Sequence, residues 1–188
     1  AWGNRISGTV IFQGQELAQI TLEAAIRLGM ALVTEDRRRY GLILDQSVGF
    51  NLSLSILSQL TSNFLIDTHR EYESNKKQFD SLGIKAPGLE FPADGLSGGN
   101  QQKIIIGKAL MSRPSIVFFD EPTRGIDVGA KHEIYQIVRG LTDGGGAVAL
   151  ASSELPELIA MSDRILMLRA GCVAGYFSKE QARQEALL

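Results

Sequence analysis

The sequence has little of what several large protein classes require. Its 188 residues contain one cysteine, Cys172, which excludes a disulfide within the chain and suits a reducing compartment such as the cytosol. No apolar run approaches the ~20 residues that a membrane-spanning helix needs, so contact with a membrane has to come through partners. The 19 basic and 21 acidic residues give a net charge of -2, and without a basic field the chain is a poor candidate for binding nucleic acid.

The residue types most often linked to catalysis give weak signals outside one region. Cys172 is followed by Val173 and Ala174 and has no adjacent base, which favours a packed strand residue over a nucleophile. His69 lies among polar residues without a companion at metal-ligand spacing, which favours a surface position. The length fits one compact domain that can bury a sizeable core.

An apolar run that ends in two carboxylates is a stronger signal. Residues 116–119 are apolar, and Asp120 and Glu121 follow them directly. The pattern predicts a buried parallel strand that delivers both carboxylates to its C-terminal end, where open α/β sheets place their ligands. Mg²⁺ and water would meet there. The alternative, a cap for the next helix, is less favoured because Pro122 and Thr123 follow and a second motif precedes.

That second motif is a glycine-rich turn before a helix. Ser97, Gly98 and Gly99 allow backbone N–H groups to approach an anion, and the helix that begins there adds about half a positive charge at its N-terminus. A simple capped helix start is the alternative. Downstream, the apolar residues recur at near-helical spacing while Lys103 and Lys108 are placed to face water, so we expect this helix to pack as well as bind.

The residues and the order of these motifs resemble those of the ATPases of ABC transporters. The segment LSGGNQQK, residues 96–103, is similar to their signature sequence, and IVFFDEPTRGID, residues 116–127, is similar to their Walker B strand and D-loop. GMALVTEDRRRYGL and SSELPEL resemble more narrowly the second nucleotide-binding domain of tandem monosaccharide-importer ATPases. The resemblance covers nearly the whole chain and implies an α/β fold of the P-loop NTPase type with an inserted helical subdomain at about residues 48–112.

One motif of that family does not occur in the sequence. The phosphate-cradling Walker A pattern, Gly-x-x-x-x-Gly-Lys-Ser/Thr, is found nowhere in the 188 residues, and in the family it precedes the segment similar to residues 7–12. We therefore expect residues 1–188 to form a single partial ABC ATP-binding domain that lacks the first strand and the Walker A loop, with Ala1 marking a truncation or a cut from a larger protein.

The resemblance also implies roles for individual residues. Asp120 would hold Mg²⁺ through water, and Glu121 would act as general base on the attacking water, a role worth ~10²- to 10⁴-fold. Glu35 stands in place of the Q-loop glutamine, and its carboxylate could still ligate Mg²⁺. Ser153 replaces the switch-loop histidine that contacts the γ-phosphate, and since serine lacks the charge and reach of imidazole we expect a weak local site. ATP contacts are implied for Leu96, Ser97, Gly98, Gly99, Asn100, Gln101 and Asp127.

The hydrophobic pattern places further elements along the chain. Strands are expected at residues 8–12, 30–33 and 147–151, with a closing hairpin of 165–168 and 172–177. Helices are expected at residues 22–28, 48–60, 69–82, 128–141 and, in the tail, 179–188. The basic run at residues 37–39 is interpreted mainly as a solvated surface, with pairing to a partner's acidic loop as the alternative.

These features suggest a function and its partners. The leading hypothesis is the ATP-binding and ATP-hydrolysing component of a bacterial-type importer for a monosaccharide or similar small solute, peripheral to the cytoplasmic face of the inner membrane. Its partners would be a second nucleotide-binding domain with an intact Walker A loop, membrane permease subunits and, indirectly, a periplasmic solute-binding protein. The signature would act in trans on the partner domain's ATP. The alternative is a truncated, inactive ABC module that dimerises or regulates.

Overall fold

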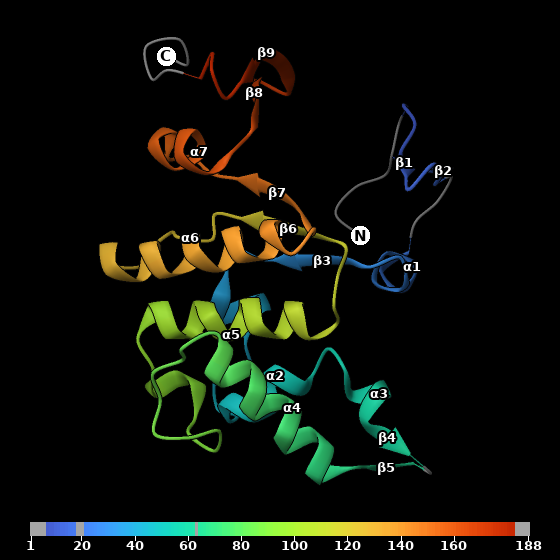
Figure 1. Cartoon of the computed structure of the whole chain (residues 1–188), viewed down its shortest axis with the longest axis vertical. Helices are drawn as coiled ribbons and strands as arrows, with labels where there is room; N and C mark the ends of the chain where they lie inside the picture. The colour runs from blue at the N-terminus through green and yellow to red at the C-terminus, as the bar shows by residue number, and fades with distance from the viewer. Residues whose placement is uncertain (1–6, 18–20, 63, 183–188) are drawn as a thin grey trace.

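A parallel sheet lies at the centre of the computed structural model, which describes residues 7–17, 21–62 and 64–182 (Figure 1). Its three strands are β3 (Met30–Val33), β6 (Ile116–Asp120) and β7 (Ala147–Ala151), in the order β3-β6-β7. Both strand pairings are parallel, and their register places Val33, Phe119 and Leu150 side by side. The short apolar runs at 30–33 and 147–151 are thereby confirmed as strands.

One face of this sheet is covered and the other is open among the described residues. Val117 and Phe119 alternate toward the covered face and are at most 2% exposed, whereas Leu32 and Phe118 on the opposite face are 66% and 39% exposed. This alternation is the two-residue period of a strand that packs on one side. The sheet therefore rests on its helices through a single face.

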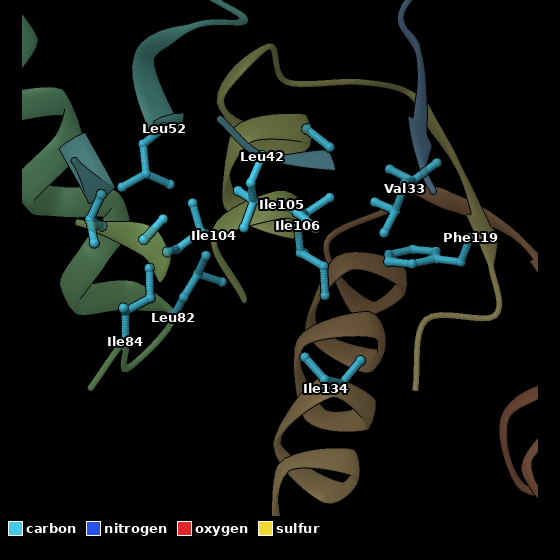
Figure 2. Close-up of a cluster of buried hydrophobic side chains, with 14 of the residues drawn as sticks. Val33, Leu42, Leu52, Leu82, Ile84, Ile104, Ile105, Ile106, Phe119 and Ile134 are labelled. Atoms are coloured by element: carbon cyan, nitrogen blue, oxygen red, sulfur yellow. The ribbon is translucent and has the colours of Figure 1, made fainter. Parts of the chain in front are cut away.

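Helix α5 (Gly98–Met111) lies between the sheet and a second layer of helices (Figure 1). Ile104, Ile105 and Ile106 are consecutive and all at most 1% exposed, so they point in three directions around the helix axis. In Figure 2, Ile104 lies on the side of Leu52, Leu82 and Ile84, whereas Ile106 lies on the side of Phe119 and of Ile134 from α6 (Val128–Asp143), all within one buried cluster. A helix surrounded in this way can be apolar on every side.

The second layer consists of short helices before α5. It contains α2 (Val48–Ser53), α3 (Leu57–Leu60), the small hairpin β4 (Thr61–Ser62) and β5 (Leu65–Ile66), and α4 (Thr68–Ser81). The expectation of one helix over residues 48–60 was wrong, because a turn at residues 54–56 separates α2 from α3. Within this turn the Ser55 hydroxyl donates to the Lys108 carbonyl at 2.5 Å, which anchors the turn to α5.

Buried amides join this layer together. Asn51 is fully buried, accepts from the Ile43 N–H at 2.8 Å and donates to the Ile43 carbonyl at 2.9 Å. Asn75, 3% exposed, donates to the Gly49 carbonyl at 2.9 Å and so links α4 to α2. These bonds fix the loop that precedes α2, because a buried amide without partners would cost about 1–3 kcal/mol.

The two ends of the chain form small peripheral units (Figure 1). The first contains β1 (Ile11–Phe12), β2 (Gln15–Glu16) and α1 (Leu22–Arg27). The other contains α7 (Leu155–Met161) and the hairpin of β8 (Arg164–Arg169) and β9 (Cys172–Ser178). Within the described ranges, none of the helices has the length and hydropathy needed to cross a membrane.

Two expectations for the C-terminal unit were wrong. Cys172 is exposed rather than packed, because the start of β9, residues 172–174, is exposed as a whole. Residues 179–181 form a turn instead of a helix, closed by the N–H of Gln181 on the carbonyl of Ser178 at 3.1 Å. The remainder of the expected helix, residues 183–188, lies outside the described residues.

Candidate functional site

The two carboxylates of the apolar strand lie at its carboxyl end, as predicted. Asp120 is the last residue of β6 and is exposed. Glu121 follows with a φ of 45°, a left-handed conformation that is uncommon outside glycine and is held by a hydrogen bond from its N–H to the Ala151 carbonyl at 2.9 Å. The strained turn redirects the Glu121 side chain toward the neighbouring strand's end.

There the structure brings together two residues predicted to act in catalysis. The carboxylate of Glu121 accepts a hydrogen bond from the backbone N–H of Ser153 at 2.7 Å. Ser153 follows β7, and the carboxyl ends of adjacent parallel strands meet at one edge, which is why residues 32 positions apart become neighbours. This bond fixes the orientation of the general-base candidate.

A buried carboxylate beneath this contact was missed by sequence analysis. Glu157 on α7 is 3% exposed and accepts from the Thr123 hydroxyl at 3.0 Å and from the Ser152 hydroxyl. Thr123 lies just after Glu121, and Ser152 just before Ser153. Glu157 therefore connects the two loops that carry the catalytic candidates, and only its place in SSELPEL could have drawn attention to it.

The glycine-rich turn begins α5 with free backbone donors. Ser97 is the residue before the helix, yet among the described residues no side chain caps the first turn, since the Ser97 hydroxyl accepts instead from the Asn100 side chain at 3.0 Å. Asn100 in turn accepts from the Lys85 N–H at 2.8 Å. Because the first N–H groups of a helix have no partner within it, those of this turn suit an anion such as a phosphate.

Other predicted residues of this segment have structural contacts instead. Gln101 is 7% exposed and donates to the Ala93 carbonyl at 3.0 Å, so its side chain supports the loop before the turn and does not reach the surface. Leu96 packs against the main core. A nucleotide would therefore meet Ser97 and the backbone of Gly98 and Gly99 before it met either of these side chains.

The two glycines of the turn are required by close packing inside the chain. A Cβ on Gly98 would lie 3.0 Å from Nη1 of Arg37, and one on Gly99 would lie 2.5 Å from Cβ of Ala130 on α6. Neither glycine has a positive φ. Because the two glycines have no side chains, Arg37 and Ala130 can approach the turn closely, as could a ligand.

Arginines connect this turn to the loop after the apolar strand. Arg37 donates to the Gly98 carbonyl at 3.0 Å and to the Gly125 carbonyl at 3.5 Å. Arg124 forms an ion pair with Glu35. The basic run therefore contributes one half-buried internal residue, which sequence analysis had placed on a solvated surface.

The ion pair bears on the predicted metal ligands. Glu35 is engaged by Arg124 and would have to release it before binding a cation, whereas Asp120 is exposed at the end of its strand. Within the described ranges, no group of three or more His, Cys, Asp or Glu side chains is placed to hold a metal ion. Asp120 alone still fits Mg²⁺, because this ion commonly takes one or two carboxylates and completes its shell with water and substrate phosphates.

Asp127 has a local structural role. Its carboxylate accepts from the Ala130 N–H at 2.9 Å and caps the start of α6. Its backbone lies two residues after Gly125, next to the turn that Arg37 contacts. Asp127 is exposed, so a surface contact with a second domain is compatible with its capping role.

The expectation that Lys103 and Lys108 face water was wrong. Lys103 is 3% exposed, and its ammonium donates to the Gly83 carbonyl at 2.7 Å and lies 2.7 Å from a Glu133 carboxylate oxygen. Lys108 donates to the Gly41 carbonyl, and burial lowers its pKa. The two lysines point in different directions and still both contact other elements, because α5 has neighbours almost all round.

Comparison with known proteins identifies the family. The sequence model of the ABC transporter family matches residues 3–124, well over half of the chain. The chain belongs to the ABC transporter family. The mixed α/β arrangement described above is the ABC ATPase fold.

Curated relatives of this ABC chain carry names from sugar import. The chain is 44% identical over 181 residues to the xylose import ATP-binding protein XylG of Moorella thermoacetica, covering 96% of the chain and 36% of the relative. It is 41% identical over 188 residues to the L-arabinose transport ATP-binding protein AraG of Geobacillus stearothermophilus, covering 100% and 37%. The ribose import ATP-binding protein RbsA 2 of Streptomyces coelicolor is 44% identical over 182 residues, covering 97% and 35%. The chain thus spans little more than a third of the length of these relatives.

Solved structures support the same fold. An ATP-binding cassette determined as a dimer in a post-hydrolysis state, bound to ADP and Pi, aligns with a TM-score of 0.76 at 20% identity and covers 93% of this chain and 74% of that one. Another ATP-binding cassette of an ABC transporter aligns with a TM-score of 0.80 at 19% identity, covering 94% and 72%. At this identity the likeness concerns the fold alone.

Proposed function

We propose that this ABC chain is part of the ATP-binding, ATP-hydrolysing component of an importer for a monosaccharide or similar small solute. The observation that carries the proposal is the uncapped start of α5, whose free N–H groups suit a phosphate and whose sequence stands where the family has its signature. The names of the xylose, arabinose and ribose relatives support sugar import. Residues 48–112 would form the helical subdomain, with the signature at 96–103 and the Walker B and D-loop segment at 116–127.

In this proposal the chain contributes to two nucleotide sites in different ways. Ser97, Gly98 and Gly99, with Asp127 nearby, would close over ATP held by the Walker A loop of a second nucleotide-binding domain. Asp120, assisted by Glu35 once Arg124 releases it, would hold Mg²⁺ at the local site, where the ion supplies charge neutralisation of the phosphates.

The remaining local residues would handle the attacking water. Glu121 is oriented by the Ser153 N–H and would accept a proton from that water. Ser153 offers a hydroxyl where a histidine would offer a charged ring, so ATP hydrolysis at the local site would be slow. Sequence 1–188 contains no Walker A pattern, so the cradle for the phosphates has to come from elsewhere.

The partners and the location follow from the same proposal. The chain would work with membrane permease subunits and, through them, with a periplasmic solute-binding protein, at the cytoplasmic face of the inner membrane. The near-neutral net charge of -2 gives no support to a nucleic-acid partner.

The test is Mg-ATP binding and hydrolysis by the chain alone and then mixed with a nucleotide-binding domain that has an intact Walker A loop. We expect turnover in the mixture only. Ser97→Arg, which fills the signature turn, should abolish it, while Ser62→Arg, the same change on an exposed strand of the β4–β5 hairpin, should not. Turnover by the chain alone that Glu121→Gln removes would overturn this division of labour, and an inactive mixture would overturn the function itself.

A further inference from the structure

Arg37 connects two loops that are distant in sequence. Its guanidinium donates from Nη1 to the Gly98 carbonyl at 3.0 Å and from Nη2 to the Gly125 carbonyl at 3.5 Å, positions 61 and 88 residues away. Gly98 belongs to the glycine-rich turn of Ser97, Gly98 and Gly99, called the signature turn below. Gly125 belongs to the D-loop segment, which follows Glu121. We propose that Arg37 is a positioning residue that sets the signature turn against the D-loop, so that both reach the nucleotide of a second domain as one rigid surface.

The surroundings of both glycines are shaped to the guanidinium. A Cβ on Gly98 would lie 3.0 Å from Nη1 and 3.4 Å from the Gly125 carbonyl, and a Cβ on Gly125 would lie 3.5 Å from Nη2. Gly125 also has a φ of 67°, which a side chain would strain. The backbones at Gly98 and Gly125 therefore lie directly against the guanidinium of Arg37.

The chemistry of the contact favours arginine specifically. A planar guanidinium offers several N–H donors at fixed angles and can hold two carbonyls at once, whereas a lysine ammonium is a compact, strongly hydrated point charge. Burial, with a smaller contribution from Arg38, lowers the pKa of Arg37, yet a guanidinium stays charged at neutral pH. The neighbouring Arg39 is engaged elsewhere, since its guanidinium lies 5.2 Å from the centre of the Tyr40 ring.

A second contact joins the same segments. Glu35, two residues before Arg37, pairs with Arg124, the residue before Gly125. The segment at 35–37 therefore holds the D-loop on both sides of the 124–125 peptide bond, and among the described residues its hydrogen bond to the signature turn comes from Arg37. Loss of Arg37 should free the signature turn most, whereas the D-loop would keep the Arg124–Glu35 ion pair with this segment.

The proposal builds on the proposed function but can be tested without it. Amide hydrogen exchange of the isolated chain would be measured for Arg37→Ala, Arg37→Lys and the matched control Arg38→Ala, in peptides that cover residues 96–102 and 121–128. We expect Arg37→Ala to accelerate exchange in both peptides, by about tenfold in the first, with Arg37→Lys intermediate and Arg38→Ala unchanged. Methylguanidinium at millimolar concentration should restore protection to Arg37→Ala, which a general folding defect would not allow.

The functional arm uses the mixture with a Walker A-containing domain. Arg37→Ala should lower kcat about tenfold with a smaller change in the KM for ATP, because the partner still holds the nucleotide while the closing surface is disordered. If exchange in both peptides of Arg37→Ala is unchanged, the positioning role is overturned whatever the turnover. If Arg37→Lys keeps full protection, the claim that the guanidinium is needed to hold both carbonyls is overturned. An inactive wild-type mixture instead contradicts the proposed function, and the exchange data still decide on Arg37.

Discussion

Replacement of Gly99 by alanine tests whether packing dictates the glycine in the signature turn. The new Cβ would lie 2.5 Å from Cβ of Ala130, about 1–1.5 Å inside the usual ~3.5–4.0 Å carbon–carbon contact. The start of α5 would have to move away from the start of α6. Overpacking of this kind typically costs about 1–3 kcal/mol.

Helix propensity acts in the opposite direction, so the net effect can be worked out. Glycine to alanine within a helix stabilises by up to ~1 kcal/mol, which leaves Gly99→Ala destabilised by about 0–2 kcal/mol. Ala130→Gly alone should cost about 1 kcal/mol. The double variant removes the clash, because the next atom, Cα of Ala130, is at an ordinary 3.8 Å. We therefore expect the double variant to have the wild-type free energy of unfolding. The sum of the two single changes would instead predict a loss of about 2 kcal/mol.

Urea unfolding followed by circular dichroism would measure all three variants. Gly140→Ala on α6 is the matched control, because a Cβ there meets no described atom within 4 Å, and it should stabilise the chain by up to ~1 kcal/mol. If Gly99→Ala stabilises as much as Gly140→Ala, or if the double variant is simply additive, the packing argument fails.

Two further predictions concern buried or paired carboxylates. Hydrogen bonds from Lys103 and, second, Lys85 lower the pKa of Glu133 from 4.5 to about 2, so its ionised form stabilises the fold above pH ~4.5 and this contribution disappears as the pH falls toward 2. Glu133→Gln should flatten the stability curve in that range, measured by urea unfolding from pH 2 to 6, and an unchanged slope would contradict the assignment. Glu157→Gln leaves one of the two hydroxyls that it holds without an acceptor and should cost about 1–3 kcal/mol. Wild-type stability in the same unfolding assay would show that Glu157 does not join the two loops.

The elements that sequence predicted best are those determined by local pattern. The strands at 30–33 and 147–151 were predicted to the residue, and the apolar run 116–119 was extended in the structure by Asp120 alone, because short apolar runs bounded by turns leave few alternatives. The meeting of Glu121 with Ser153 follows from the same logic, since both were placed directly after strands that proved to be parallel neighbours.

The incorrect predictions concern residues whose contacts lie on distant segments of the chain. Lys103 was expected in water because long charged side chains on helices usually reach it, but Glu133 and the Gly83 carbonyl, on other elements, allow it to be buried. Arg37 is one of three consecutive arginines, and nothing in the run distinguishes the one whose carbonyl partners lie 61 and 88 residues away. Such pairings become visible only when the chain is folded.

The exposed thiol at the start of β9 has a practical consequence. Cys172 is the only cysteine among the 188 residues and lies on the surface of the β8–β9 hairpin, so a maleimide dye would label this 188-residue chain once, at a known place. Energy transfer from that dye to one on a second nucleotide-binding domain would report association in real time, on the native sequence, as ATP is added and consumed.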